Sequence, residues 1–189
     1  MFPDIDIVEE INDVNLYLRK VSKEDISFYY ESLKNKRMIN YLSLGPLNSW
    51  EHSRRLIKSY LKSWEKHLQF NYLVEIREGK KIIKIGSVSL WGISWLHRRA
   101  EVGIWLLPNF WEKGNGKKSL NLLKIIAFHH LHLNRIEAHI ATENERSIKL
   151  FKNCGFKEEG TLKQYLHLNG NFYDSIILAC LKSFRNQIS

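Results

Sequence analysis

Hydrophobic and polar positions follow two periods along the chain, and each period predicts a different kind of element. Apolar residues alternate with polar ones over Phe70–Arg77 and over Ile82–Trp91, and Glu78-Gly79-Lys80 joins the two segments. This pattern predicts a β-hairpin, because successive side chains of a strand point to opposite faces. In all, strands are expected at Leu16–Arg19, Phe70–Arg77, Ile82–Trp91, Arg99–Leu107, Arg135–Ile140, Phe156–Leu162, Tyr165–Leu168 and Phe172–Leu181.

Apolar residues spaced three and four apart predict helices between these strands. Ser22 with Asp25 three residues later is typical of a helix start, and Asn48 or Ser49 caps a second helix. Gly155 is placed to end the last helix, since glycine tolerates the left-handed conformation found there. The helices are expected at Ser22–Lys34, Asn48–His67, Lys117–Leu133 and Asn144–Cys154.

With the adjacent segments Phe156–Leu162 and Tyr165–Leu168 counted together, the order of these elements is β-α-α-β-β-β-α-β-α-β-β. This order predicts one α/β domain built around a mixed sheet. A chain of 189 residues is long enough for one domain with a proper core and short for two. Residues 1–15 carry five carboxylates and no lysine or arginine. We therefore expect a flexible acidic N-terminal arm at residues 1–15 and a single domain at 16–189.

Composition narrows the class of protein. The net charge of +9 suits a polyanionic ligand such as a phosphorylated cofactor or a nucleic acid, although a lysine-rich surface gives the same number. Aromatic residues do not alternate with arginines, which makes nucleic-acid binding a minor hypothesis.

Cys154 and Cys180 are interpreted as reduced core thiols. No apolar run is long enough to cross a bilayer and no signal-peptide pattern is present, so a cytoplasmic protein without membrane contact is expected.

The segment Trp111–Ser119, W-E-K-G-N-G-K-K-S, is the strongest candidate for a binding site. A glycine-rich turn that opens a helix leaves backbone N–H groups unpaired at the positive end of the helix dipole, where they can hold phosphate. A Walker A loop is excluded because Trp111 and Lys118 replace its first glycine and its hydroxyl. A dinucleotide fingerprint is excluded because Ser119 replaces its third glycine. A plain strand-to-helix turn stays open as the alternative.

Two further segments carry a resemblance to a known family. Leu96–Leu106 resembles the h-R-x-A-E-h-G-Y-x-L strand, and Asn144–Phe156 resembles the N-x-x-S-x-x-L-Y-x-x-x-G-F signature, of ribosomal-protein N-terminal (Rim-type) and spermidine acetyltransferases. With the glycine turn, these motifs identify the chain as a member of the GNAT N-acetyltransferase superfamily. The resemblance implies an acyl-CoA N-acyltransferase fold: a mostly antiparallel sheet with a splay between its fourth and fifth strands, flanked by helices.

The resemblance also implies acetyl-CoA as the co-substrate, with no metal. Backbone amides of the turn would hold the pyrophosphate, the splayed fourth strand would pair with the pantetheine, and Asn144 would contact the pantetheine amide. The turn keeps both glycines of the family's loop but has Trp111 in place of Gln or Arg. The expected cofactor-binding residues are Ile104, Trp105, Leu106, Lys113, Gly114, Asn115, Gly116, Lys117, Lys118, Asn144, Ser147 and Phe151.

Acetyl transfer to an amine requires that a proton leaves the nitrogen, so a general base is sought near the splay. Glu101 is the first candidate, acting through water, with an ion pair to Arg98 or Arg99 as the structural alternative. Glu137 and His139 on the next strand are its rivals, and a half-exposed strand histidine is the plainer interpretation of His139.

The proton donor for the CoA thiolate is less well marked. Many relatives have a tyrosine where this chain has Phe151, which cannot donate a proton. Ser147, Tyr165, Tyr173 or water could take the role, or the thiolate could leave unassisted, and Phe151 would pack against the pantetheine or the core. Three histidines, His129, His130 and His132, lie near the end of the helix expected at Lys117–Leu133. They are interpreted as part of a solvated helix face and not as a metal site.

The main functional hypothesis is direct acetyl transfer, within a ternary complex, to a protein N-terminal amine. A polyamine or other small amine is the alternative acceptor, and a non-catalytic acyl-CoA sensor is the alternative class. A rim containing Lys36, Arg37, Arg98, Arg99 and Lys163 argues against a polycation. The resemblance leaves room for association with the ribosome and for a homodimer.

Overall fold

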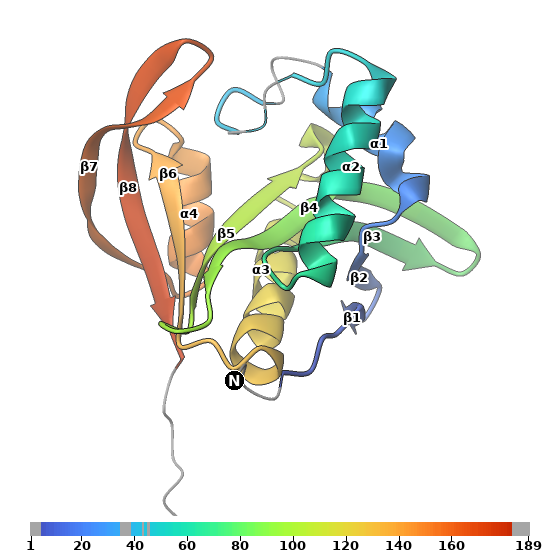
Figure 1. The fold of residues 1–189 in the computed structure, drawn as a ribbon, viewed down its shortest axis with the longest axis horizontal. Coiled ribbons are helices and arrows are strands. Elements are labelled where there is room, and N and C mark those ends of the chain that lie inside the picture. Colours follow the sequence, from blue (N-terminus) through green and yellow to red (C-terminus); the bar gives the residue numbers. More distant parts are fainter. Residues whose placement is uncertain (1–4, 35–38, 43, 45, 183–189) are drawn as a thin grey trace, which may run out of the picture.

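The structure, a computed structural model, describes residues 5–34, 39–42, 44 and 46–182 of the chain. The described residues form one eight-stranded sheet in the order β1-β2-β3-β4-β5-β6-β8-β7 (Figure 1). Its strands are β1 Glu10–Asp13, β2 Leu16–Lys20, β3 Phe70–Glu78, β4 Lys81–Ser94, β5 Arg99–Leu106, β6 Arg135–Ala141, β7 Lys157–Leu168 and β8 Asn171–Leu181. The helices are α1 Ile26–Leu33, α2 Trp50–Glu65, α3 Asn115–Ile125 and α4 Glu145–Asn153. The predicted mixed, mostly antiparallel sheet flanked by helices is confirmed.

The sheet opens between β5 and β6, its one parallel pair among the described residues. These strands pair only at their starts, with Arg99 opposite Arg135 and Glu101 opposite Glu137. Beyond Glu101 the ladder ends and the two strands diverge, as Figure 1 shows. This is the predicted splay between the fourth and fifth strands, counted from Leu16. Backbone groups on the opened edge of β5 lack a strand partner there and must be satisfied by other means.

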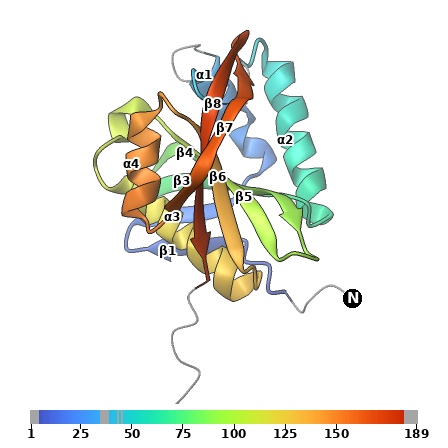
Figure 2. The same cartoon turned by 90° about the vertical axis from the view of Figure 1, so that its left-hand side faces the viewer.

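Helices cover both faces of the sheet. Figure 2 shows α2 on one side and α4 on the other. The alternation of β3 divides its side chains between the two layers: Phe70 and Tyr72 join the core beneath α3, whereas Leu73 joins the core beneath α1 and α2. Trp105 of β5 is buried in this second core with Tyr29. Burial on both faces fixes the register of the sheet, because a slip of one residue would exchange the layers.

The acidic N-terminal segment is more ordered than expected. Residues Glu10–Asp13 form β1, which pairs with β2, so the prediction of a flexible arm is wrong for this stretch. Its apolar residue Ile11 packs against the main core, and Glu10 forms an ion pair with Arg77 of β3. The tyrosine hydroxyl of Tyr72 also donates to the Val8 carbonyl at 2.8 Å. Apolar and charged contacts together hold the segment on the sheet edge.

Two other boundaries differ from the prediction. The two strands expected at Phe156–Leu162 and Tyr165–Leu168 are one strand, β7, with register shifts near Gly160 and between Leu162 and Leu166. The bulges break the regular alternation, which is why the sequence reads as two segments. The helix expected at Lys117–Leu133 begins two residues earlier, and after Ile125 it continues as a π-helical turn at Ile126–His130.

Candidate active site

The glycine turn forms the N-terminus of α3, next to the opened edge of β5. Gly114 is its N-cap residue and has φ +81°, a left-handed conformation that favours glycine. A Cβ at Gly116 would lie 3.0 Å from Leu150 of α4, so this glycine allows the two helices to approach closely. The first amides of α3 therefore point out of the turn without side chains in front of them. The amide of Lys118 is an exception. It donates to the Gly114 carbonyl at 3.0 Å and is therefore not free to bind a phosphate, contrary to the expectation for this turn.

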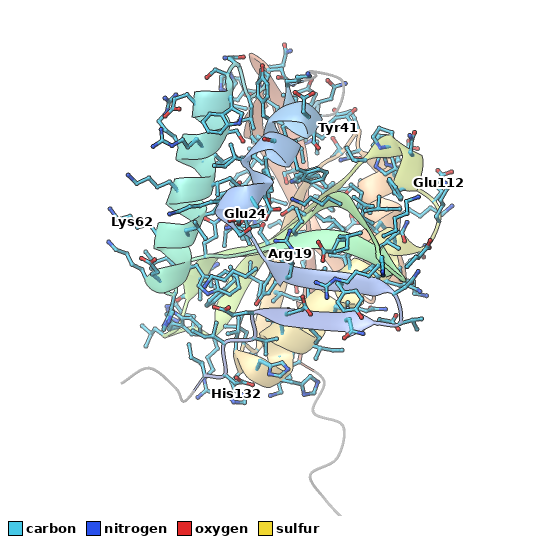
Figure 3. The ribbon with its side chains drawn as sticks, turned by 90° about the vertical axis from the view of Figure 1, so that its right-hand side faces the viewer. Arg19, Glu24, Tyr41, Lys62, Glu112 and His132 are labelled. Atoms are coloured by element: carbon cyan, nitrogen blue, oxygen red, sulfur yellow. The ribbon has the colours of Figure 1, made fainter. Side chains whose placement is uncertain are left out.

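A cavity of about 670 Å³ lies beside this helix start. Its walls come from the end of β5, the glycine turn, α4 and the segment before α2. The cations Lys117, Arg146 and Lys149 face it, against one carboxylate, Glu112. In Figure 3, Glu112 and Tyr41, which both line this cavity, lie toward the same end of the molecule, and His132 lies at the opposite end. The excess of positive charge in this wall favours an anionic ligand.

A second cavity of about 360 Å³ lies where β5 and β6 diverge. Its described lining contains neutral polar, aromatic and aliphatic side chains and no Asp, Glu, Lys or Arg. Ile104, Trp105, Asn144 and Ser147 line both cavities, so the two cavities adjoin at the splay. The remaining lining residues are Tyr41, Leu42, Leu44, Tyr60, Gln69, Asn71, Ser87, Ser89, Trp91, Val102, Gly103, Ala138, His139, Ile140, Ala141 and Phe151.

Comparison with known proteins identifies this arrangement. A sequence model described as the acetyltransferase (GNAT) domain matches residues 15–157. The chain belongs to the GNAT family of acetyltransferases. It is an N-acetyltransferase, as expected, and one similar acetyltransferase of known structure is in complex with CoA.

Two kinds of GNAT acetyltransferase are similar to this chain. A spermidine N(1)-acetyltransferase from Vibrio cholerae is 30% identical, over 84% of this chain and 88% of its own. The crystal structure of a spermidine N-acetyltransferase from Vibrio cholerae in complex with CoA and spermine has a TM-score of 0.79 at 29% identity, covering 89% of this chain and 96% of that one. A ribosomal L7/L12 α-N-protein acetyltransferase in complex with CoA shares the fold, with a TM-score of 0.83 at 23% identity over 92% and 98% of the chains.

Most of the cofactor-binding residues expected for this GNAT acetyltransferase gather at the larger cavity. Those in its wall are Ile104, Trp105, Leu106, Gly114, Gly116, Lys117, Asn144 and Ser147. Asn144 is also the N-cap of α4, where its side-chain oxygen accepts from the Ser147 amide at 3.3 Å. Phe151 lines the smaller cavity instead. Lys113, Asn115 and Lys118 stand on the same turn but are not in either lining.

Trp111, at the position where the family has Gln or Arg, makes two contacts that no sequence motif indicated. The Trp111 indole N–H donates to the Leu106 carbonyl at 2.7 Å, and the Arg146 guanidinium lies 3.3 Å from the centre of the Trp111 ring. Trp111 thus positions a cation from α4 beside the glycine turn, by a cation–π contact. Residues 35 apart in sequence form this pair, and neither belongs to a motif that would have revealed it.

Glu137 is held in ion pairs. Its carboxylate accepts from Arg135 at 2.5 Å and from Arg99 at 3.3 Å, and His139 Nε2 lies 3.6 Å away. Burial alone would raise the pKa of Glu137, but the hydrogen bond and charge of Arg135, aided by His139, outweigh it and hold this pKa below its ordinary value. A carboxylate so stabilised in its charged form is a poor proton acceptor.

Glu101 lies in the opposite electrostatic situation. Burial raises the pKa of Glu101, and the charge of Glu137 raises it further, against the opposing effect of His139. Glu101 is not in the cavity wall, but it precedes Gly103 and Trp105 on the same face of β5, and both of these line the smaller cavity. Among the three candidate bases, His139 is the one in that wall.

Phe151 is buried and packs edge-on against Phe156, with ring centres 4.9 Å apart, which confirms the core packing expected for it. Of the alternative proton donors, Ser147 lines both cavities, whereas Tyr165 stacks on His139 with ring centres 5.0 Å apart. Tyr173 packs against Tyr41.

The basic rim expected from the sequence is only partly visible. Lys36 and Arg37 lie outside the described residues. Lys163 is paired with Asp174 at 2.7 Å and Arg99 with Glu137, so these two positive charges are partly neutralised.

The histidines at the end of α3 lie away from both cavities. His130 pairs with Asp6 at 2.9 Å, which fastens the N-terminal segment. Within the part of the chain that the structure describes, no three His, Cys, Asp or Glu side chains come together as a metal site. Nor does any helix there have the length and apolar character needed to cross a membrane.

The polar wall of the smaller cavity was missed at the sequence level. Asn71 and Gln69 of the β3 region and Ser89 of β4 line it, and Asn71 is only 3% exposed. The sequence contained one relevant pattern: Asn71 lies on the face of β3 opposite to Phe70 and Tyr72, and an amphipathic helix precedes the strand. A polar residue on a strand face covered by a helix is buried, and buried polar groups need a partner.

Proposed function

We propose that this enzyme transfers acetyl from acetyl-CoA to a protein N-terminal amine, by direct transfer in a ternary complex. The observation that carries the choice of acceptor is the charge of the smaller cavity. No carboxylate is found in its described lining, although it has room for a peptide end. A polyamine carries several positive charges and would be desolvated there without a counter-charge, which is costly. A peptide N-terminus brings only one amine, which must become neutral to react.

The larger cavity fits coenzyme A by its chemistry. The free amides at the start of α3 would hold the pyrophosphate, and Lys117, Arg146 and Lys149 would add positive charge for the remaining phosphate. The opened edge of β5 at Ile104–Leu106 offers backbone groups for the two pantetheine amides. The thioester would then reach Ile104 and Trp105, which line both cavities, and meet the amine there.

Proton removal is assigned to Glu101 and His139 together. His139 lies in the wall where the amine would sit, and the raised pKa of Glu101 makes that carboxylate a suitable final acceptor near neutral pH. The nitrogen then attacks the thioester carbon, the C–S bond breaks, and the CoA thiolate takes a proton from solvent or from Ser147. Glu137 stays ionised with its arginines and orients the His139 ring.

A polyamine acceptor is the second candidate, because the similar spermidine acetyltransferases are 29% and 30% identical over most of the chain, against 23% for the ribosomal-protein acetyltransferase. The difference between the two acceptors is the number of charges that must enter a neutral cavity. Spermidine turnover that rises steeply with pH, as its amines lose protons, would support this alternative.

Initial rates of CoA release, measured with acetyl-CoA and a panel of short peptides at varied concentrations of both, test the proposal. Intersecting reciprocal plots and a product acetylated on its α-amine are expected. Parallel plots, or no peptide turnover, would contradict it. As a control for the cofactor site, Gly116→Asp should weaken CoA binding measured by calorimetry by about 100-fold, because a carboxylate would face the pyrophosphate and a Cβ would press on Leu150.

A further inference from the structure

Two polar side-chain atoms in the described part of the chain are buried without a hydrogen-bond partner: Asn71 Nδ2 and His139 Nδ1. Both residues line the smaller cavity. A buried unpaired donor or acceptor destabilises a protein by about 1–3 kcal/mol, so such groups are rare and call for an explanation. Their occurrence together in one cavity wall suggests that a bound molecule supplies the missing partners.

The two atoms differ in what they require. Gln69 Nε2 donates to Asn71 Oδ1 at 3.1 Å, which turns the amide so that Nδ2 is left as a donor. The His139 Nε2 atom faces the Glu137 carboxylate at 3.6 Å, which favours the proton on Nε2 and leaves a lone pair on Nδ1. The cavity therefore lacks one hydrogen-bond acceptor for Asn71 and one donor for His139.

Strand register places the two residues in one row across the sheet. Asn71 is opposite Ser89, and Ser89 is opposite Gly103. Continuing the register of Glu101 with Glu137 by two residues brings His139 to the level of Gly103. Residues in such a row share a face of the sheet.

Gly103 forms the floor between the two polar residues. A Cβ on it would lie 2.8 Å from the Ser89 hydroxyl and would fill the space above the row. Two strand spacings separate Asn71 from Gly103 by roughly 10 Å between Cα atoms, and His139 lies farther on, across the splay, so the side chains must shorten the gap. A molecule bridging it needs an amine at one end and a hydrogen-bond acceptor at about the length of one or two residues.

We propose that Asn71 binds a carbonyl oxygen of a peptide acceptor, in its first or second residue, while the α-amine faces His139. This inference rests on the proposed function. It adds the peptide carbonyl to the amine as a second group that the site recognises. A protonated polyamine offers only donors and cannot satisfy Asn71 Nδ2. The acceptor class is therefore an aminoacyl chain, and Asn71 is a specificity-determining residue.

The test compares two acceptors, tetra-alanine amide and hexylamine, which carry a primary amine with and without nearby carbonyls. Asn71→Leu should lower kcat/KM for tetra-alanine amide by about tenfold or more, through the lost hydrogen bond. For hexylamine the change should be less than about threefold. Asn12→Leu on the outer strand β1, the same exchange far from the cavities, should change neither value.

The outcomes separate the two proposals. An equal loss with both acceptors, or no loss with the peptide, overturns the role of Asn71 while peptide acetylation by the wild type leaves the proposed function standing. If the wild type acetylates no peptide, both proposals fail. Because Asn71→Leu could misfold, the CoA dissociation constant of the variant is measured first.

The wild type supplies a second arm that needs no variant. It is assayed with a tetra-alanine amide in which the first two peptide bonds are replaced by trans-alkene isosteres, which removes the carbonyls without adding a charge. The inference requires that this change lowers kcat/KM by about tenfold in the wild type. An undiminished rate overturns it.

Discussion

Strand β3 carries two buried polar residues, Asn71 and Glu75, on the same face and four positions apart. They differ in whether their side chains find hydrogen-bond partners within the protein. The Glu75 carboxylate accepts from Arg19 at 3.0 Å and from Arg77 at 2.7 Å. Asn71, at the other end of the strand, has no hydrogen-bond partner for its side-chain Nδ2.

The surroundings continue the contrast. Next to Glu75, Arg19 also holds the buried Asp25 with two hydrogen bonds of 2.8 and 2.9 Å, and Lys84 reaches the same carboxylate at 2.6 Å. Asn71 instead lines the smaller cavity. A polar cluster whose partners are all within the chain contributes to folding, whereas one left incomplete contributes to binding. Variants on the two sides should therefore separate stability from activity.

The largest effect is expected on the incomplete side. Glu101→Gln should lower turnover by about 100-fold at neutral pH with little change in CoA affinity, because the variant cannot accept the proton. In the wild type the rate should rise with pH through the raised pKa of Glu101, since only the ionised form is a base. Measuring kcat against pH for both proteins checks this, and an unchanged rate in the variant would shift the role to His139 or to the substrate.

The same variant should be at least as stable as the wild type. A carboxylate whose pKa is raised in the folded state destabilises that state at pH values above its pKa, and Gln removes this charge. Urea unfolding at neutral pH provides the measurement, and a clear loss of stability would place Glu101 among the structural ion pairs.

Asp25→Asn should have the reverse profile. Burial alone would raise the pKa of Asp25, but the hydrogen bonds from Arg19 and Lys84 outweigh it and lower this pKa from 3.8 to about 2. Because the folded pKa is the lower one, the ionised carboxylate stabilises the fold above pH 4 by roughly 2 kcal/mol, and this contribution is lost as the pH falls toward 2. Urea unfolding should show the deficit of the variant at pH 7 and its disappearance near pH 2, with kcat unchanged at pH 7.

Glu137→Gln sharpens the comparison within the site itself. Because its arginine partners hold the pKa of Glu137 low, we expect it to orient His139 and not to accept the proton. The variant should lose less than about tenfold in kcat, in line with one weakened hydrogen bond. A loss as large as that of Glu101→Gln would make Glu137 the base.

The smallest effect is expected on the open surface. Arg54 and Glu51 form an exposed pair on α2 at 2.9 Å, with side chains 57% and 51% exposed. Arg54→Gln should change the free energy of unfolding by less than about 0.5 kcal/mol, because solvent screens such pairs. A larger change in urea unfolding would show that pairing alone, without burial, governs the stability of this protein.

The sequence was most informative where a function depends on local backbone geometry. Gly114 and Gly116 mark the helix start because glycine is required there for conformation and close approach. The splay could also be expected, through the motif that contains Glu101. Strand β1 was missed because five carboxylates in the first fifteen residues obscure the contribution of Ile11.

The acceptor cavity was less predictable because its wall is assembled from distant segments. Asn71, Gly103 and His139 come from three strands, and only strand register places them in one row. Arg146 stacks on Trp111 through a contact that no local pattern encodes. Non-local contacts of this kind follow from the packing of the whole sheet and cannot be read from a single segment.

Competition between two acceptors tests the central claim most directly. Tetra-alanine amide and spermidine are mixed at equal concentrations with limiting acetyl-CoA, and the products are quantified by mass spectrometry. If the cavity is neutral and binds a peptide carbonyl, the α-N-acetyl peptide should exceed acetylspermidine by about tenfold or more. Predominant acetylspermidine would contradict the account.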